Sequence, residues 1–164
     1  MTSGTITVAA DAIRAVREHG ERTYPEECCG VIIGQDRDGQ RSIDAMLPID
    51  NVQDENRKRR FLISPSQYIA AEKSATDRGL ELLGFYHSHP DHPAAPSAFD
   101  TEHALPWFTY MIVSVQNGKA DKLTAWTLQE NRIQFTECAM TVRPEHAKQS
   151  GTRNNNFTKE FPWR

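Results

Sequence analysis

Hydrophobic and polar positions alternate with two different periods along the first 140 residues of the chain, and each period predicts one kind of element. Apolar residues two apart, or short apolar runs rich in β-branched residues, predict strands, whereas apolar residues three or four apart predict helices. Strands and helices interleave, which predicts a mixed α/β fold. The predicted strands cover 5–8, 28–34, 41–50, 81–90, 109–118, 122–129 and 132–140, and the predicted helices cover 11–22, 65–78 and 101–105.

The central helix carries clear local signals at its start. Ser64 is a typical N-cap residue, and Pro65 suits the first helical position, where a backbone N–H is not needed. The apolar spacing that follows predicts that Ile69, Ala70 and Ala75 lie on the inner side of this helix.

Length and polarity divide the chain into one domain and a tail. A chain of 164 residues can bury one sizeable core, so we expect a single domain, at 1–142. The hydrophobic periodicity is lost after it, which predicts a polar tail at 143–164. The tail is predicted to be mobile. Its aromatic residues, Phe157, Phe161 and Trp163, leave docking on the domain or on a partner as an alternative.

The charge balance argues against a nucleic-acid partner. Nineteen Lys and Arg residues against 22 Asp and Glu residues give a net charge of −3, without the basic face that nucleic-acid binding needs. The basic run within 51–60 is interpreted as a solvated loop, with a role in partner binding as the alternative.

The chain is expected to work in the cytoplasm. No apolar run approaches the ~20 residues that span a bilayer, and the N-terminus lacks the pattern of a secretory signal. Three cysteines, Cys28, Cys29 and Cys138, form a poor disulfide framework and indicate reduced thiols.

The residues that carry chemistry follow the strand predicted at 81–90. His87 and His89 are two apart, so both imidazoles project from one face of that strand. If Ser97 opens a short helix, Asp100 lies one turn further on, where its carboxylate could join them. Two histidines and one carboxylate suit Zn²⁺ with an open fourth position. An isolated His-x-His pair is more often structural, but the added Pro90 and Ser-x-x-Asp make a much rarer combination.

The stretch His87–Pro90, followed after six residues by Ser97–Asp100, resembles the H-x-H-P-x6-S-x2-D signature of the JAMM, or MPN-plus, metalloproteases. Glu27, which stands before Cys29–Gly30, resembles the upstream glutamate of that family. The similarity extends through most of 5–140. It implies an MPN (JAMM) domain, in which a mixed β-sheet of the cytidine-deaminase-like type is sandwiched by helices.

The resemblance also implies a role for each matching residue. His87, His89 and Asp100 would bind a catalytic Zn²⁺, Glu27 would be the general base, and Ser97 would donate a hydrogen bond to the developing oxyanion.

Several nearby residues have less specific interpretations. Glu26 would lie on the face of the strand opposite to Glu27. His92 and His103 are interpreted as solvated, with a contact to substrate as the alternative, and His19 and His146 as structural or surface residues.

The resemblance implies a ubiquitin-like protein substrate. The short chain resembles the stand-alone prokaryotic members, which act on ubiquitin-like sulfur-carrier proteins, so we expect cleavage after a C-terminal Gly-Gly. A general deubiquitinase-like isopeptidase is one alternative, and a non-catalytic MPN scaffold is another. The resemblance is compatible with a homodimer, although the sequence does not define an oligomeric state.

Overall fold

One mixed sheet organises the computed structural model, which describes residues 4–58 and 60–145. Within these residues the sheet has eight strands in the order β7-β6-β5-β4-β2-β3-β1-β8. The pairs β1/β3, β1/β8 and β4/β5 are parallel and the others antiparallel. In chain order the elements are β1 (Ile6–Ala9), α1 (Ala10–Thr23), β2 (Cys29–Arg37), β3 (Gln40–Ile49), α2 (Pro65–Asp77), β4 (Glu81–Pro90), α3 (Ala98–His103), β5 (Thr109–Gln116), β6 (Lys119–Leu128), β7 (Phe135–Cys138) and β8 (Met140–Arg143).

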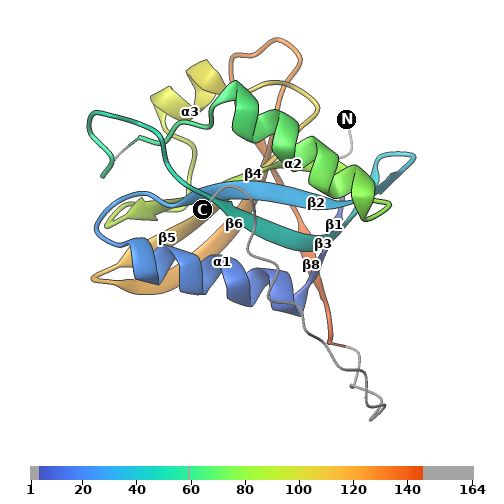
Figure 1. The fold of residues 1–164 in the computed structure, drawn as a ribbon, viewed down its shortest axis with the longest axis horizontal. Helices are drawn as coiled ribbons and strands as arrows, with labels where there is room; N and C mark the ends of the chain where they lie inside the picture. The colour runs from blue at the N-terminus through green and yellow to red at the C-terminus, as the bar shows by residue number, and fades with distance from the viewer. Residues whose placement is uncertain (1–3, 59, 146–164) are drawn as a thin grey trace.

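Helices cover both faces of the sheet, with α1 on one side and α2 and α3 on the other (Figure 1). Alternate residues of β2 therefore enter two different cores. Ile32 packs in the cluster that contains Val16 of α1, whereas Val31 and Ile33 pack in the cluster that contains Ala71 of α2. Burial on both faces explains why this strand is an unbroken apolar run rather than an alternating one.

The start of α2 confirms the sequence prediction, but the face of the helix that packs on the sheet differs from it. Ser64 is the N-cap, and its side chain accepts a hydrogen bond from the Gln67 N–H. Ala71 and Ala75, one turn apart, are fully buried, whereas Ile69 is 65% exposed. Residues two apart on a helix point about 200° apart, so the small Ala71/Ala75 stripe on the sheet turns Ile69 to solvent. The prediction of an inward Ile69 is therefore wrong.

The prediction of one strand at 132–140 is also wrong, because in the structure this stretch forms parts of two strands at the two edges of the sheet. β7 pairs with β6, and β8 pairs with β1, with only Ala139 between them. The two edge strands are thus consecutive in the chain, so the sheet is strongly curved. Large twisted sheets commonly curl in this way.

The end of β8 reaches one residue into the tail predicted from the sequence. Arg143 ends the strand and forms an ion pair with Asp44, with 2.6 Å between Nη2 and Oδ1. Most of that tail, including its three aromatic residues and His146, lies outside the described residues. Among the described residues, no helix is long and apolar enough to cross a membrane.

Candidate metal centre

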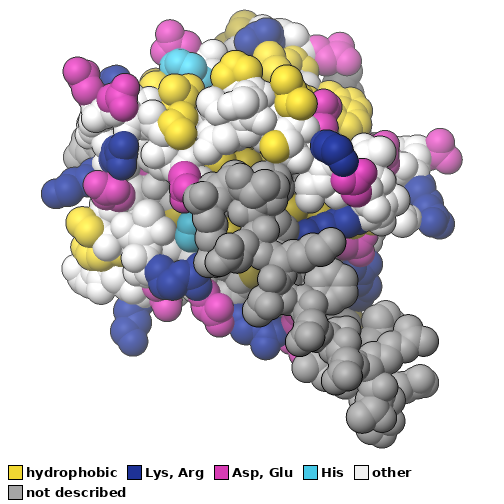
Figure 2. Space-filling model, in the orientation of Figure 1, with side chains coloured by type: hydrophobic (Ala, Val, Ile, Leu, Met, Phe, Trp, Pro, Cys, Tyr) yellow, Lys and Arg dark blue, Asp and Glu magenta, His cyan; other side chains and the backbone are white. Residues whose placement is uncertain are grey.

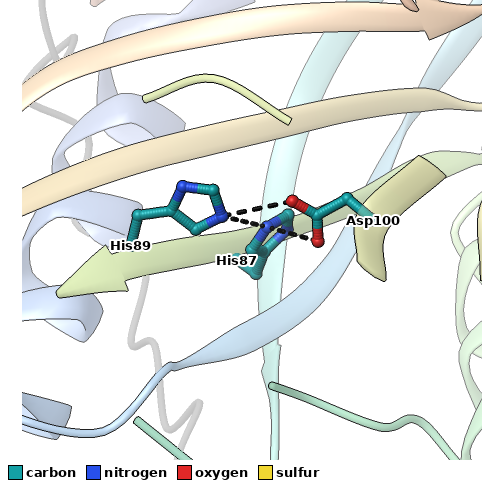
Figure 3. Close-up of side chains that lie close together, drawn as sticks. All are labelled: His87, His89 and Asp100. Carbon is teal, nitrogen blue, oxygen red and sulfur yellow. Dashed lines mark hydrogen bonds and ion pairs between the residues drawn. The ribbon is translucent and has the colours of Figure 1, made fainter. Parts of the chain in front are cut away.

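Two buried histidines and one aspartate meet where β4 ends and α3 begins (Figure 3). His87 and His89 project from the same side of β4 and are 1% and 6% exposed. Ser97 and Asp100 fix the start of α3 by a reciprocal capping box: the Asp100 N–H donates to Ser97 Oγ, and the Ser97 N–H donates to Asp100 Oδ2. The helix therefore begins at Ala98 rather than at 101, and the cap turns the Asp100 carboxylate toward β4.

The spacing of the three side chains fits a metal ion. His87 Nε2 lies 3.0 Å from His89 Nε2 and 3.1 Å from Asp100 Oδ1, and His89 Nε2 lies 3.2 Å from Asp100 Oδ2. A tetrahedral zinc ion with bonds of about 2.0–2.1 Å holds its ligand atoms about 3.3 Å apart. One oxygen-bearing and two nitrogen-bearing side chains at this separation are a donor set that zinc accepts.

The tautomer of His89 leaves the correct nitrogen available for a metal. Its Nδ1–H donates to the backbone carbonyl of Pro93 at 2.9 Å, because a carbonyl can only accept. In the neutral ring Nε2 then keeps its lone pair, which points at the other two side chains. A partner on the second ring nitrogen is the arrangement that orients metal-binding histidines.

The electrostatics of the three groups favour a cation between them. Burial lowers the pKa of His87, against the attraction of the Asp100 charge. Burial also acts to lower the pKa of His89, but its hydrogen bonds to Asp100 and Pro93 and the nearby carboxylates raise it overall. Burial raises the pKa of Asp100, yet the two histidines and the Ser97 N–H hold it well below its usual range. An ionised carboxylate beside two imidazoles therefore faces the point where the cation would bind.

Glu27 is buried beside this group, whereas Glu26 is exposed. It stands just before β2, whose first residue, Cys29, lies opposite His87 in the antiparallel register. Burial raises the pKa of Glu27 to about 8; the charge of His89 lowers this pKa, and that of Asp100 raises it. A carboxyl group that has a pKa near neutrality and interacts with the charges of two candidate ligands is suited to accept and return a proton.

Ser97 is positioned chiefly by its role as a cap. Its Oγ accepts the Asp100 N–H at 3.1 Å, which leaves the hydroxyl hydrogen unused by that bond. The side chain is at the exposed edge of the group, so this hydrogen can be directed at a bound molecule.

The segment between β3 and α2 contributes residues that the sequence analysis missed. Phe61 stacks on His87, with ring centroids 4.5 Å apart and 25° between the planes. The Arg60 guanidinium lies over the ring of Phe99, 5.2 Å from its centroid. The one signal for Phe61 in the sequence is its place, as an aromatic residue directly after a basic run.

An apolar cavity of about 270 Å³ adjoins His87 and Asp100. Hydrophobic side chains also gather over α2 and α3 in Figure 2, and the rim of the cavity includes Leu62 and Leu105, which are 45% and 48% exposed. The aromatic residues that line the cavity are Phe61, Tyr68, Phe85, Phe99, Phe108, Tyr110 and Phe135.

The opposite face of β4 is fixed by buried polar contacts. Tyr86 shares a 2.8 Å hydrogen bond with His19 Nδ1, and the Cys28 N–H donates to Ser88 Oγ at 2.8 Å. A Cβ on Gly30 would lie 2.3 Å from the Tyr86 ring, so the glycine makes room for that ring. Tyr86 and Ser88, on either side of His87, are therefore fixed by hydrogen bonds. Because His19 makes one of these bonds, its interpretation as a structural residue is confirmed.

Two other histidines of the described residues lie outside the metal-binding group. His92 is exposed, and its backbone carbonyl accepts hydrogen bonds from Ser114 Oγ and Gln116 Nε2. His103 is exposed, stacks on Phe99 with centroids 4.0 Å apart, and borders the apolar cavity.

Comparisons with known proteins agree with this fold. Residues 9–129 match the family described as prokaryotic homologs of the JAB domain, so the chain belongs to that family. It is 34% identical to the desampylase of Haloferax volcanii over 139 residues, which cover 80% of this chain and 95% of that protein. It is 31% identical to a probable TtuB-protein conjugate cleaving protease of Thermus thermophilus over 108 residues, which cover 66% of this chain and 69% of that protein.

A solved structure shows the same fold. The solution structure of a Desulfitobacterium hafniense protein has a TM-score of 0.76 to this chain at 23% identity, and covers 90% of this chain and 99% of that one. The family and the mixed α/β fold expected from the sequence are thus confirmed, and the chain is a hydrolase of the JAB group.

Proposed function

We propose that this chain is a Zn²⁺-dependent metallopeptidase that hydrolyses the peptide or isopeptide bond after the C-terminal Gly-Gly of a ubiquitin-like, sulfur-carrier-type protein. The observation that carries the proposal is the triangle of ligand atoms on His87, His89 and Asp100, with buried Glu27 beside it. These three side chains would hold the metal.

The chain's own residues then divide the chemistry between them. Bound zinc would supply a Lewis acid and lower the pKa of a water molecule to about 7. Glu27 takes a proton from the attacking water and returns it to the nitrogen of the leaving amine. The Ser97 hydroxyl donates to the oxygen of the scissile carbonyl as negative charge develops on it. Burial of the histidines and Glu27 strengthens these interactions because bulk water is excluded.

The names of the relatives support a protein conjugate as substrate. One is a desampylase and another a probable protease of TtuB-protein conjugates. The apolar cavity beside His87 offers an extended tail a surface to lie on. A general isopeptidase with the same metal centre remains the alternative within this chemistry. We place the reaction in the cytoplasm, and the three free, buried cysteines support that placement.

A substrate panel tests the proposal. Purified protein with zinc is mixed with carriers that end in Gly-Gly and carry either a linear extension or an isopeptide-linked amine, and released products are identified by mass spectrometry. The proposal expects cleavage directly after Gly-Gly, lost on chelation and restored by zinc. Failure to process any extended carrier would overturn it, and equal cleavage of ubiquitin conjugates and carrier conjugates would favour the general isopeptidase.

His103→Ala serves as the matched control for loss of an imidazole. His103 borders the cavity but does not belong to the metal-binding group. It should keep the bound zinc that His89→Ala loses.

A further inference from the structure

Segment 91–97 determines where Asp100 lies relative to the two histidines. It connects the end of β4, which carries His89, to Ser97, the N-cap of α3. Prolines at positions 93 and 96 lack backbone N–H groups, and the segment belongs to no strand or helix. Its shape therefore depends on contacts with other elements.

Three successive backbone carbonyls of this segment each accept a hydrogen bond from a different strand. The His92 carbonyl accepts from Ser114 Oγ of β5 at 2.6 Å, and the Pro93 carbonyl accepts from His89 Nδ1 of β4 at 2.9 Å. The Ala94 carbonyl accepts from Thr124 Oγ1 of β6 at 2.6 Å. One of these donors is a candidate ligand, and the other two are side chains outside the metal-binding group.

The Thr124 hydroxyl is itself held in one orientation. The Trp126 Nε1–H donates to Thr124 Oγ1 at 2.8 Å, so the single hydroxyl hydrogen is left for the Ala94 carbonyl, its nearest acceptor. Thr124 is 2% exposed and Ala94 is 7% exposed. Because an unpaired polar group is costly at such a buried place, the hydrogen bond fixes the carbonyl strongly.

We propose that Thr124 is a positioning residue for the metal centre, acting through the Ala94 carbonyl on segment 91–97, with Ser114 acting in the same way through the His92 carbonyl. This inference rests on the proposed function, because it assumes that the three side chains bind zinc. Without the hydroxyl, the Ala94 carbonyl loses its partner and the segment relaxes. Asp100 is then less well placed for the ion.

Replacement of Thr124 by valine removes the hydroxyl at nearly constant shape. Thr124→Val should bind zinc about tenfold more weakly than wild type, the lower end of the effect of outer hydrogen-bond partners on metal affinity. Thr124→Ser keeps a hydroxyl and should recover most of the affinity. Zinc affinity is measured by competition with a coloured chelator. The absorption spectrum of the Co²⁺-substituted protein reports the ligand geometry without any substrate.

Thr127→Val is the matched control on the same strand. Its hydroxyl lies 3.2 Å from Cys138 Sγ and makes no hydrogen bond to segment 91–97 among the described residues. It should leave zinc affinity and the Co²⁺ spectrum unchanged, even if its unfolding temperature falls as far as that of Thr124→Val.

The proposal is overturned if Thr124→Val binds zinc as tightly as wild type with the same Co²⁺ spectrum, or if Thr124→Ser is as weak as the valine variant. If Thr124→Val does not fold, Thr124→Ala removes the same hydroxyl from a smaller side chain and decides the question by the same two measurements. Failure of the wild-type protein to bind zinc would instead contradict the proposed function itself.

Discussion

Two segments meet at the metal centre, and they are held in different ways. Segment 91–97, on the side of His89 and Asp100, is fixed through three carbonyls by side chains of three neighbouring strands. Segment 51–62, which packs over Glu27 and His87, is held by a backbone hydrogen bond from the Glu27 N–H to the Arg57 carbonyl at 2.7 Å and by the side chain of Asn51. Asn51 donates to the carbonyls of Glu27 and Arg60 and accepts from the N–H groups of Gln53 and Leu62.

The difference separates metal binding from catalysis and substrate binding. Donors that belong to the sheet can move only with the sheet, so the metal-binding side is preorganised before any ligand arrives. The side that carries Glu27 and Phe61 rests on contacts within and beside a loop, and can adjust when a substrate binds. Changes in segment 51–62 should therefore alter kcat or KM while zinc stays bound.

The largest effect is expected from Glu27→Gln. The amide cannot take a proton from water, so kcat/KM should fall by about 10²- to 10⁴-fold, the usual contribution of a general base. Zinc content, measured on the same preparation, should remain at the wild-type level because no ligand changes. Glu26→Gln alters the exposed neighbour and should leave kcat/KM unchanged. Full activity of Glu27→Gln would show that another group is the base.

Asn51→Ala should have the next largest effect. It removes four hydrogen bonds, one to the Glu27 carbonyl and three within segment 51–62. Misplacement of a reacting group can cost up to about 10²-fold in rate, so we expect kcat/KM to fall by about 10- to 100-fold with zinc retained. Asn131→Ala removes two side-chain hydrogen bonds in the turn after β6 and is the control. Loss of zinc from Asn51→Ala would contradict the independence of the two segments.

Phe61→Ala should have a smaller effect, confined to substrate binding. The ring covers His87 and lines the apolar cavity. An aromatic contact contributes about 0.5–1.5 kcal/mol, so KM should rise by about 2- to 10-fold with little change in kcat. Phe61→Leu keeps an apolar surface but loses the ring, so its KM should lie between those of wild type and Phe61→Ala. Steady-state kinetics on a carrier substrate measure both constants. A fall in kcat at constant KM would contradict a role of Phe61 in substrate binding.

The smallest effect on activity is expected from His19, which affects stability instead. Burial, together with the charge of Arg22, lowers the pKa of His19 to about 4, against the charge of Asp50, which raises it. Because the pKa of His19 in the folded protein lies below the unfolded value of 6.5, protonation of the ring favours the unfolded chain. The contribution of the neutral ring to stability is therefore complete above pH 6.5 and is lost as pH falls toward 4. Relative to His19→Gln, wild type should lose roughly 1–3 kcal/mol of unfolding free energy across that range. Urea unfolding at several pH values measures it, and parallel pH curves for the two proteins would contradict the assignment.

Local signals explain why much of the site could be predicted from the sequence. The His87/His89 pair follows from strand periodicity, and Asp100 follows from the capping spacing that begins at Ser97, so both depend on residues close in the chain. The same capping box that makes Ser97 the N-cap also fixes the Asp100 carboxylate, because that carboxylate accepts the Ser97 N–H.

Long-range contacts explain what the sequence could not reveal. Thr124 lies 30 residues from the carbonyl that it holds, and no periodicity links them. The predicted strand at 132–140 fails for a related reason: the pattern does not say which edge of the sheet a strand joins, and here the two halves join opposite edges. The inward face of α2 depends on which side chains the sheet can accommodate, so Ile69 could not be placed from its spacing alone.

The most direct test of the central claim is the zinc content of native protein, measured by mass spectrometry on wild type and on the double variant with His87→Ala and His89→Ala. The account predicts about one zinc per chain in the wild type, as for a three-residue catalytic site, and none in the variant. Absence of zinc from both proteins, even after incubation with the metal, would contradict it and favour a non-catalytic scaffold.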